Sequence, residues 1–135
     1  MKLARPSEKL AGCVWLPRIL GKARLLQAGA LPPDYSARFC HPNGVDGVFL
    51  SHFGLNREDI LAAAGLCDEE AGEWFLSRVG VEPIQRWNKI AVNLGRPGYP
   101  MADRLPAGLA TTYQRVAGRG LATVFEVLEA DEEDA

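Results

Sequence analysis

Apolar side chains recur along most of the chain at intervals of three or four residues, which is the period of an amphipathic α-helix. Strand-like alternation of apolar and polar residues is nearly missing. Glycines, prolines and capping residues divide the periodic stretches from one another. The pattern therefore predicts an all-α fold of about seven short amphipathic helices and no sheet. Eight periodic stretches underlie this approximate count, and they cover residues 7–16, 17–28, 45–54, 56–64, 68–79, 83–94, 106–116 and 121–128.

The most distinctive predicted helix begins at Pro17, because proline suits the first helical position, where its missing N–H costs no hydrogen bond. A helical wheel places its apolar side chains within an arc of roughly 120°, and Gly29 follows as a stop signal. We expect the core to consist of this stripe and of the large apolar residues of the later helices. These residues are Leu16, Ile19, Leu20, Ala23 and Leu26 of the stripe, and Trp74, Phe75, Trp87, Leu94, Tyr113, Val116 and Phe125.

Two local signals refine this prediction. Asn56 and Asp59 have the spacing of a reciprocal N-terminal cap, so they mark the start of one helix. Residues 30–44 contain three prolines and no sustained period, which predicts a long loop.

Composition supports one globular domain. Of the 135 residues, 47% are hydrophobic and 24% are charged, which is an ordinary mixture for a packed protein. We expect a single domain over residues 1–128 and an acidic, frayed tail over 129–135.

The longest apolar run, residues 60–67, is too short to cross a membrane, and the start lacks the apolar core of a secretory signal. These features favour a cytoplasmic protein with no membrane partner. The three cysteines include no C-x-x-C pair, and no histidine motif has metal-ligand spacing, so we expect neither a disulfide framework, a bound metal nor a cofactor.

Charge is distributed unevenly along the chain. Residues 1–45 contain seven Lys or Arg and two acidic residues, a net charge of +5, whereas the remainder has a net charge of −7. A basic start of this kind favours an anionic partner or ligand, or a contact with the chain's own acidic tail.

The predicted helix at 17–28 carries three of these basic residues, Arg18, Lys22 and Arg24. Arg18 and Lys22 are one turn apart and share a face, while Arg24 lies at the opposite edge of the apolar stripe. Together with Tyr35 and His41 of the 30–44 loop, they form our candidate anion-binding site. The simpler interpretation is that they only edge an amphipathic helix. The leading functional hypothesis is a binding or interaction module for an anionic small molecule or an acidic protein partner.

Two other classes stay open as alternatives. Cys40 or His41 could serve an enzyme, although no complete catalytic set is visible. The short turn at Gly65 resembles a helix-turn-helix, but the second helix would present Asp68, Glu69, Glu70 and Glu73 to DNA phosphates, which argues against nucleic acid. His52 lies on the apolar face of its helix, so we interpret it as a core histidine with one satisfied nitrogen. A dimer patch that includes Leu3, Leu25, Leu31 and Tyr99 also stays open.

The run "PSEKLAGCVWLPRILGKAR" over residues 6–24, followed by the Tyr35 loop and Asp46, resembles the signature of a bacterial family known only as a domain of unknown function. The similarity is strongest over residues 5–60. It implies a bacterial cytosolic protein, with Leu16-Pro17-Arg18 and Lys22-Ala23-Arg24 as hallmark, and it carries no assigned activity.

Overall fold

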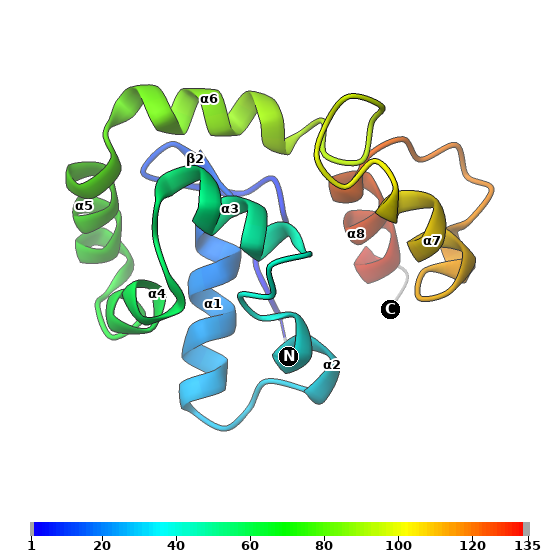
Figure 1. Cartoon of the computed structure of the whole chain (residues 1–135). Helices are drawn as coiled ribbons and strands as arrows, with labels where there is room; N and C mark the ends of the chain where they lie inside the picture. Colours follow the sequence, from blue (N-terminus) through cyan, green and yellow to red (C-terminus); the bar gives the residue numbers. More distant parts are fainter. Residues whose placement is uncertain (1, 134–135) are drawn as a thin grey trace. The chain divides into compact units, whose positions relative to one another are not determined.

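The computed structural model describes residues 2–133 (Figure 1). The chain divides into two compact units, one ending at Trp87 and one beginning at Asn88. The prediction of a single domain over residues 1–128 stays a prediction. The predicted all-α class is confirmed, with a short hairpin added. In the described residues the elements are β1 (Lys9–Leu10), β2 (Cys13–Val14), α1 (Leu16–Gln27), α2 (Pro33–Arg38), α3 (Val45–Phe53), α4 (Arg57–Ala63), α5 (Asp68–Val79), α6 (Val81–Ala91), α7 (Arg104–Ala110), the 3₁₀ helix η1 (Gln114–Val116) and α8 (Val124–Glu133).

The prediction of a helix over residues 7–16 is wrong, and so is the prediction of no sheet. This segment forms an antiparallel hairpin in which Lys9 pairs with Val14 and Leu10 with Cys13. The two-residue turn places both Ala11 and Gly12 at positive φ, 53° and 73°. That combination suits the twist of a tight hairpin, and it interrupts any helix through the segment.

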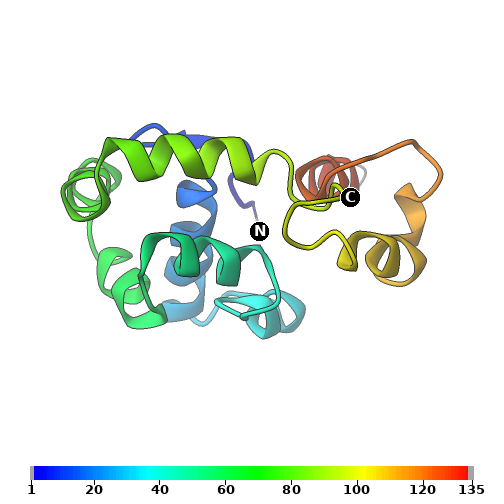
Figure 2. The same cartoon turned by 45° about the horizontal axis from the view of Figure 1, so that its top comes forward.

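The first unit is arranged around α1, which lies at its centre with α3 and α4 beside it (Figure 1 and Figure 2). The predicted boundaries of α1 are confirmed to within one residue, and its apolar stripe is buried except for Leu26, which is half-buried. α1 also buries two cations, Arg18 and Lys22. The prediction of an irregular 30–44 loop needs correction, since Pro33 begins the short helix α2 there.

Helices α3 to α6 agree with their predicted positions, and the predicted cap at Asn56 is confirmed. The Asn56 side chain accepts from the Asp59 amide and the Asp59 carboxylate accepts from the Asn56 amide, both at 2.9 Å. Phe49, Phe75 and Trp87 form the aromatic centre of the first unit, and the Phe49 ring centroid lies 5.8 Å from that of Phe75 and 5.4 Å from that of Trp87. The Trp87 indole donates to the Val14 carbonyl at 2.9 Å, so the first unit's last helix is bonded to its hairpin.

In the second unit, the predicted helix over 106–116 is divided into α7 and η1, because residues 111–113 leave the helical conformation. The last helix begins at Val124 rather than at Leu121 and continues through Glu133. Residues 129–133 of the acidic tail are therefore helical, and residues 134–135 lie outside the described part. Asp131 of this tail pairs with Arg115 at 3.0 Å. Most of the predicted core is confirmed across both units, but Trp74 and Tyr113 are half-buried.

Candidate functional site

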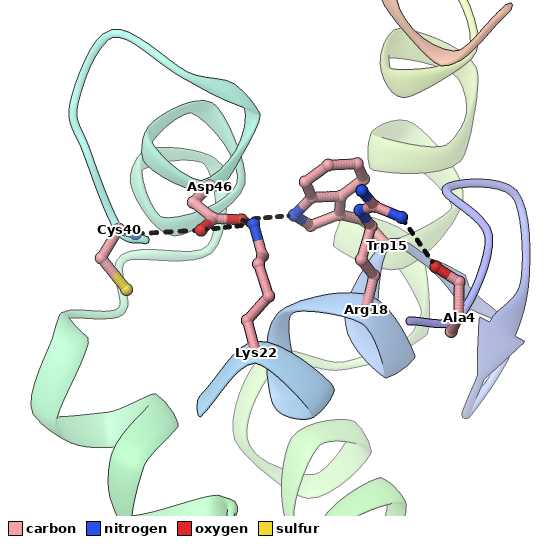
Figure 3. Close-up of polar contacts among 6 residues, drawn as sticks. All are labelled: Ala4, Trp15, Arg18, Lys22, Cys40 and Asp46. Atoms are coloured by element: carbon pink, nitrogen blue, oxygen red, sulfur yellow. Dashed lines mark hydrogen bonds and ion pairs between the residues drawn. The ribbon is translucent and has the colours of Figure 1, made fainter. Parts of the chain in front are cut away.

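The carboxylate of Asp46 lies at the centre of a buried polar cluster in the first unit (Figure 3). Its Oδ1 accepts a hydrogen bond from the Trp15 indole at 2.7 Å, and Lys22 Nζ lies 2.8 Å from both carboxylate oxygens. The backbone N–H of Cys40 donates to Oδ2 at 2.9 Å. Three donor groups from three parts of the chain thus converge on one carboxylate.

The local sequence explains how each member reaches this point. Lys22 lies on α1, three positions after Ile19 of the buried stripe, so it shares that face and its side chain is buried. Asp46 is in the first turn of α3, where the helix dipole stabilises a negative charge. Trp15 is the residue before α1, and Cys40 lies in the turn between α2 and α3. The cluster therefore joins α1, α3 and the 30–44 segment.

Two members of the cluster have backbone conformations that L-residues rarely adopt. Trp15 has φ of 74° and Cys40 has φ of 58°. Left-handed conformations cost a residue with a Cβ on the order of 1 kcal/mol or more, and they persist where the surroundings hold them. Both residues donate a hydrogen bond to Asp46, so this carboxylate helps to hold both conformations.

Arg18 is buried next to the cluster without contacting Asp46. Its Nη1 donates to the Ala4 carbonyl at 2.9 Å, and its guanidinium carbon lies 5.3 Å from the centre of the Trp15 ring. Lys22 Nζ lies 4.9 Å from the same ring centre, so two cations flank one indole. Burial lowers the pKa of Lys22, Asp46 opposes that effect, and the nearby Arg18 adds to it.

Arg24 lies elsewhere on α1 and has a different task. Its Nη1 pairs with Asp68 at 2.7 Å, and its Nε and Nη2 donate to the carbonyls of Ala64 and Leu66 at 3.2 and 2.9 Å. These carbonyls follow the end of α4, so Arg24 joins that end to the start of α5. The three basic residues of α1 are therefore not brought together into one surface.

The remaining candidates lie on the 30–44 segment. Tyr35 is half-buried on α2. His41 is exposed, and its Nδ1 accepts a hydrogen bond from the Asn43 amide at 3.1 Å within the turn. Burial, together with the negative charge of Asp46, raises the pKa of the Cys40 thiol to about 12, so this thiol stays protonated at neutral pH. That is the opposite of the activation that a cysteine nucleophile needs.

His52 matches its interpretation as a packed histidine with one satisfied nitrogen. It is half-buried, and its Nε2 lies 2.8 Å from the carbonyl oxygen of Pro83, which identifies that nitrogen as the donor. Its ring packs edge-on against Phe53.

Sequence reasoning missed Asp46 and Trp15 as members of the cluster. A signal for Asp46 was present, because a lysine beside an apolar stripe requires an acidic partner if the stripe is fully covered. No local pattern showed which acid that would be, since Asp46 is 24 residues from Lys22.

The helix-turn-helix alternative depends on α4 and α5. The first turn of α5 carries Asp68, Glu69 and Glu70, and all three are exposed. This acidic end is where such a motif would approach DNA phosphates.

Residues 2–133 offer neither a cluster of metal-ligating side chains nor a membrane-spanning helix. No group of three or more His, Cys, Asp or Glu side chains in this part could hold a metal ion. None of its helices has the length and apolar character that a membrane crossing requires.

The fold and the cluster together define a small, mostly helical protein whose first unit contains a buried lysine–aspartate pair. The chain belongs to the family described as a domain of unknown function, DUF5069, whose family model matches residues 2–134. Neither a curated protein nor a solved structure matches it.

Proposed function

We propose that this protein is a binding module that recognises an anionic ligand, small molecule or acidic partner, on the 30–44 segment of its first unit. The observation that carries the proposal is at the base of this segment. The exposed Arg57 places its guanidinium over the buried Phe39 ring, 5.2 Å from the ring centre. A guanidinium that packs against an aromatic ring still has N–H donors available for a carboxylate or a phosphate.

The five candidate residues take different parts in this proposal. His41 and Tyr35 belong to the segment itself and are the ones that would meet a ligand beside Arg57. Arg18 and Lys22 act from the interior, where Lys22 fixes the segment through Asp46. Arg24 fixes the start of α5, and its contribution is the positive charge that it adds to the basic half of the chain.

The test is a thermal-shift titration at low salt, because surface electrostatics is screened as ionic strength rises. The probes are inorganic phosphate and a short poly-glutamate peptide, which separate a small anion from an acidic partner. A ligand at about 100 times its Kd adds roughly 2.7 kcal/mol, which raises Tm by roughly 10–20 °C in a unit of this size.

The decisive variant is Arg57→Gln, and its matched control is Arg86→Gln. Arg86 is also exposed, and its partner Glu82 lies 3.9 Å away on the same helix. We expect wild type and Arg86→Gln to respond to one probe and Arg57→Gln to lose the response. If neither probe shifts the Tm of the wild type, or if both variants respond equally, the proposal is wrong.

Enzymatic use of Cys40 or His41 is the second candidate. It ranks lower because the Cys40 thiol is protonated and the His41 ring is engaged within its own turn. Nucleic-acid binding through α4 and α5 ranks below both because of its acidic approach face.

Other features of the biological setting stay predictions, namely a bacterial origin, a cytoplasmic location and a homodimer. Of the residues suggested for a dimer patch, Tyr99 is exposed, whereas Leu3, Leu25 and Leu31 are half-buried. Sedimentation at micromolar concentration measures the oligomeric state directly, and a clean monomer would remove the homodimer.

A further inference from the structure

We propose that residues 31–44 detach locally while the rest of the first unit stays folded, and that the hydrogen bond from the Cys40 amide to Asp46 opposes this opening. We call this hydrogen bond the latch. The inference does not depend on anion binding. It rests on how the segment is attached and on which residues hold Asp46 in place.

The attachment of the segment contains little apolar burial. Within the described range 31–44, Phe39 is the one buried residue, and α2 buries none of its side chains. Next to Phe39, the Cys40 amide donates its hydrogen bond to Asp46. Segments with few buried apolar contacts open at a lower free energy than the packed core around them. The hydrogen bond from the Cys40 amide to Asp46 is thus one polar contact that helps to hold this segment.

The opposite side of the latch is firmly packed. Lys22 holds the carboxylate from α1 and Trp15 holds it from the position just before α1, next to core residues that are fully buried. Asp46 itself is 1% exposed. Opening at Cys40 therefore leaves the carboxylate two of its three donor groups, so the segment can detach while α1 and α3 stay joined.

Backbone strain favours the open state. Cys40 has φ of 58°, a conformation that it can leave once its amide is released from Asp46. The following turn packs closely on α3, where a Cβ at Gly47 would approach the His41 carbonyl oxygen to 2.4 Å. Cys40, whose backbone is strained, thus lies directly before the tight contact between the His41 turn and Gly47. We expect the segment to detach at Cys40.

Cys40 is half-buried in the closed segment, and opening exposes its thiol further, while the other two cysteines supply internal references. Cys13 is fully buried and reports unfolding of the whole first unit, whereas Cys67 is exposed and reports the intrinsic rate of the reagent. Peptide-resolved labelling with iodoacetamide therefore separates local opening from global unfolding in a single sample.

The test variant is the double substitution Lys22→Met/Asp46→Leu, which removes the acceptor of the Cys40 amide and leaves no unpaired buried charge. Lys9→Met is the control because Lys9 is exposed on β1. Asp46 raises the pKa of the Cys40 thiol and Lys22 lowers it, so removing both acts on the thiol in opposite directions. We expect Cys40 to be labelled at least tenfold faster in the double variant, with Cys13 accelerated far less. Equal acceleration at Cys13 and Cys40, or none at Cys40, would overturn the latch.

Hydrogen exchange on the wild type tests the same inference without a substitution. We expect the Cys40 amide to exchange at least tenfold faster, after correction for intrinsic rates, than the amides of Leu20 and Ala23 on α1. Exchange of all three amides through one common opening would show that the segment has no opening of its own, and the proposal would be wrong.

Discussion

Lys22 and Arg24 leave the same helix two residues apart, and each pairs with an aspartate, yet the two pairs differ in what surrounds them. The Lys22–Asp46 pair has side chains 6% and 1% exposed, whereas those of Arg24 and Asp68 are 35% and 70% exposed. A buried charge cannot return to water when its partner is removed, whereas an exposed one can. The two ion pairs have similar distances, 2.8 and 2.7 Å, but we expect their loss to change the free energy of unfolding by very different amounts.

The largest effect is expected from breaking the buried pair. Lys22→Met leaves the Asp46 carboxylate buried without its cation, and we expect the free energy of unfolding to fall by about 3–5 kcal/mol. Urea denaturation followed by circular dichroism measures the change, with Lys9→Met as the exposed control. The double variant Lys22→Met/Asp46→Asn should recover part of the loss because it removes the orphaned charge. A cost for Lys22→Met below about 1 kcal/mol would place the pair with surface pairs and break the comparison.

The next largest effect is expected at Gly47 of α3, next to Asp46 of the buried pair. The turn at His41 and Pro42 packs closely against Gly47. A Cβ added in Gly47→Ala would meet backbone atoms of His41 and Pro42 at 2.4–2.5 Å, and backbone atoms cannot move aside cheaply. We expect a loss of about 1–3 kcal/mol in the same urea experiment. Gly65→Ala is the matched control, because its Cβ would make an ordinary contact at 3.5 Å. Equal stability of the two variants would show that the turn moves away freely.

The pH dependence of stability gives a further comparison between a buried and an exposed side chain, in this case the thiols of Cys13 and Cys67. Burial raises the pKa of the Cys13 thiol from 9.0 to about 12, so the unfolded chain loses this proton before the folded one does. The resulting contribution to stability is complete below pH 9 and is lost as pH rises from 9 toward 12. At pH 10 we expect a loss of roughly 1.4 kcal/mol relative to neutral pH.

The measurement is the difference between wild type and Cys13→Ala in urea denaturation at pH 8 and pH 10, under reducing conditions. Lys22 titrates in the opposite sense, because its lowered pKa gives a contribution that grows with pH, and it cancels in this difference. Cys67→Ala, which changes an exposed thiol, should retain the pH dependence of the wild type. A difference that does not vary with pH would contradict the expected burial effect.

The smallest effect is expected at the exposed pair. Asp68→Asn removes the charge that faces Arg24 and leaves the two carbonyl contacts of Arg24 in place. We expect a cost of about 0.2–1 kcal/mol that disappears in 1 M salt, where charges are screened over about 3 Å. A cost near that of Lys22→Met would show that exposure does not distinguish the two pairs.

Helices with both a periodic face and a stop signal were predictable from sequence, as the contrast between α5 and the hairpin illustrates. α5 repeats its apolar face over three turns and ends at Gly80, so local information was sufficient. Each hairpin strand has two residues, too few to show alternation, and its Ala11-Gly12 turn lacks the usual Asn-Gly signal.

The candidate site was harder to predict because its geometry depends on distant contacts. The helical wheel correctly separated Arg18 and Lys22 from Arg24, since that separation follows from α1 alone. It could not show that α3 covers Lys22, because the partner is 24 residues away, nor that Trp15 adopts a left-handed backbone. Burial of a charged side chain is a property of the assembled unit rather than of its helix.

The hydrogen bond from the Trp87 indole to the Val14 carbonyl bears on how the protein is synthesised. It joins residues 73 positions apart, at nearly opposite ends of the first unit. A chain growing on the ribosome therefore carries its hairpin and α1 for most of the unit's length before Trp87 exists to cover them. The unit can therefore complete its core only after Trp87 has emerged from the ribosome.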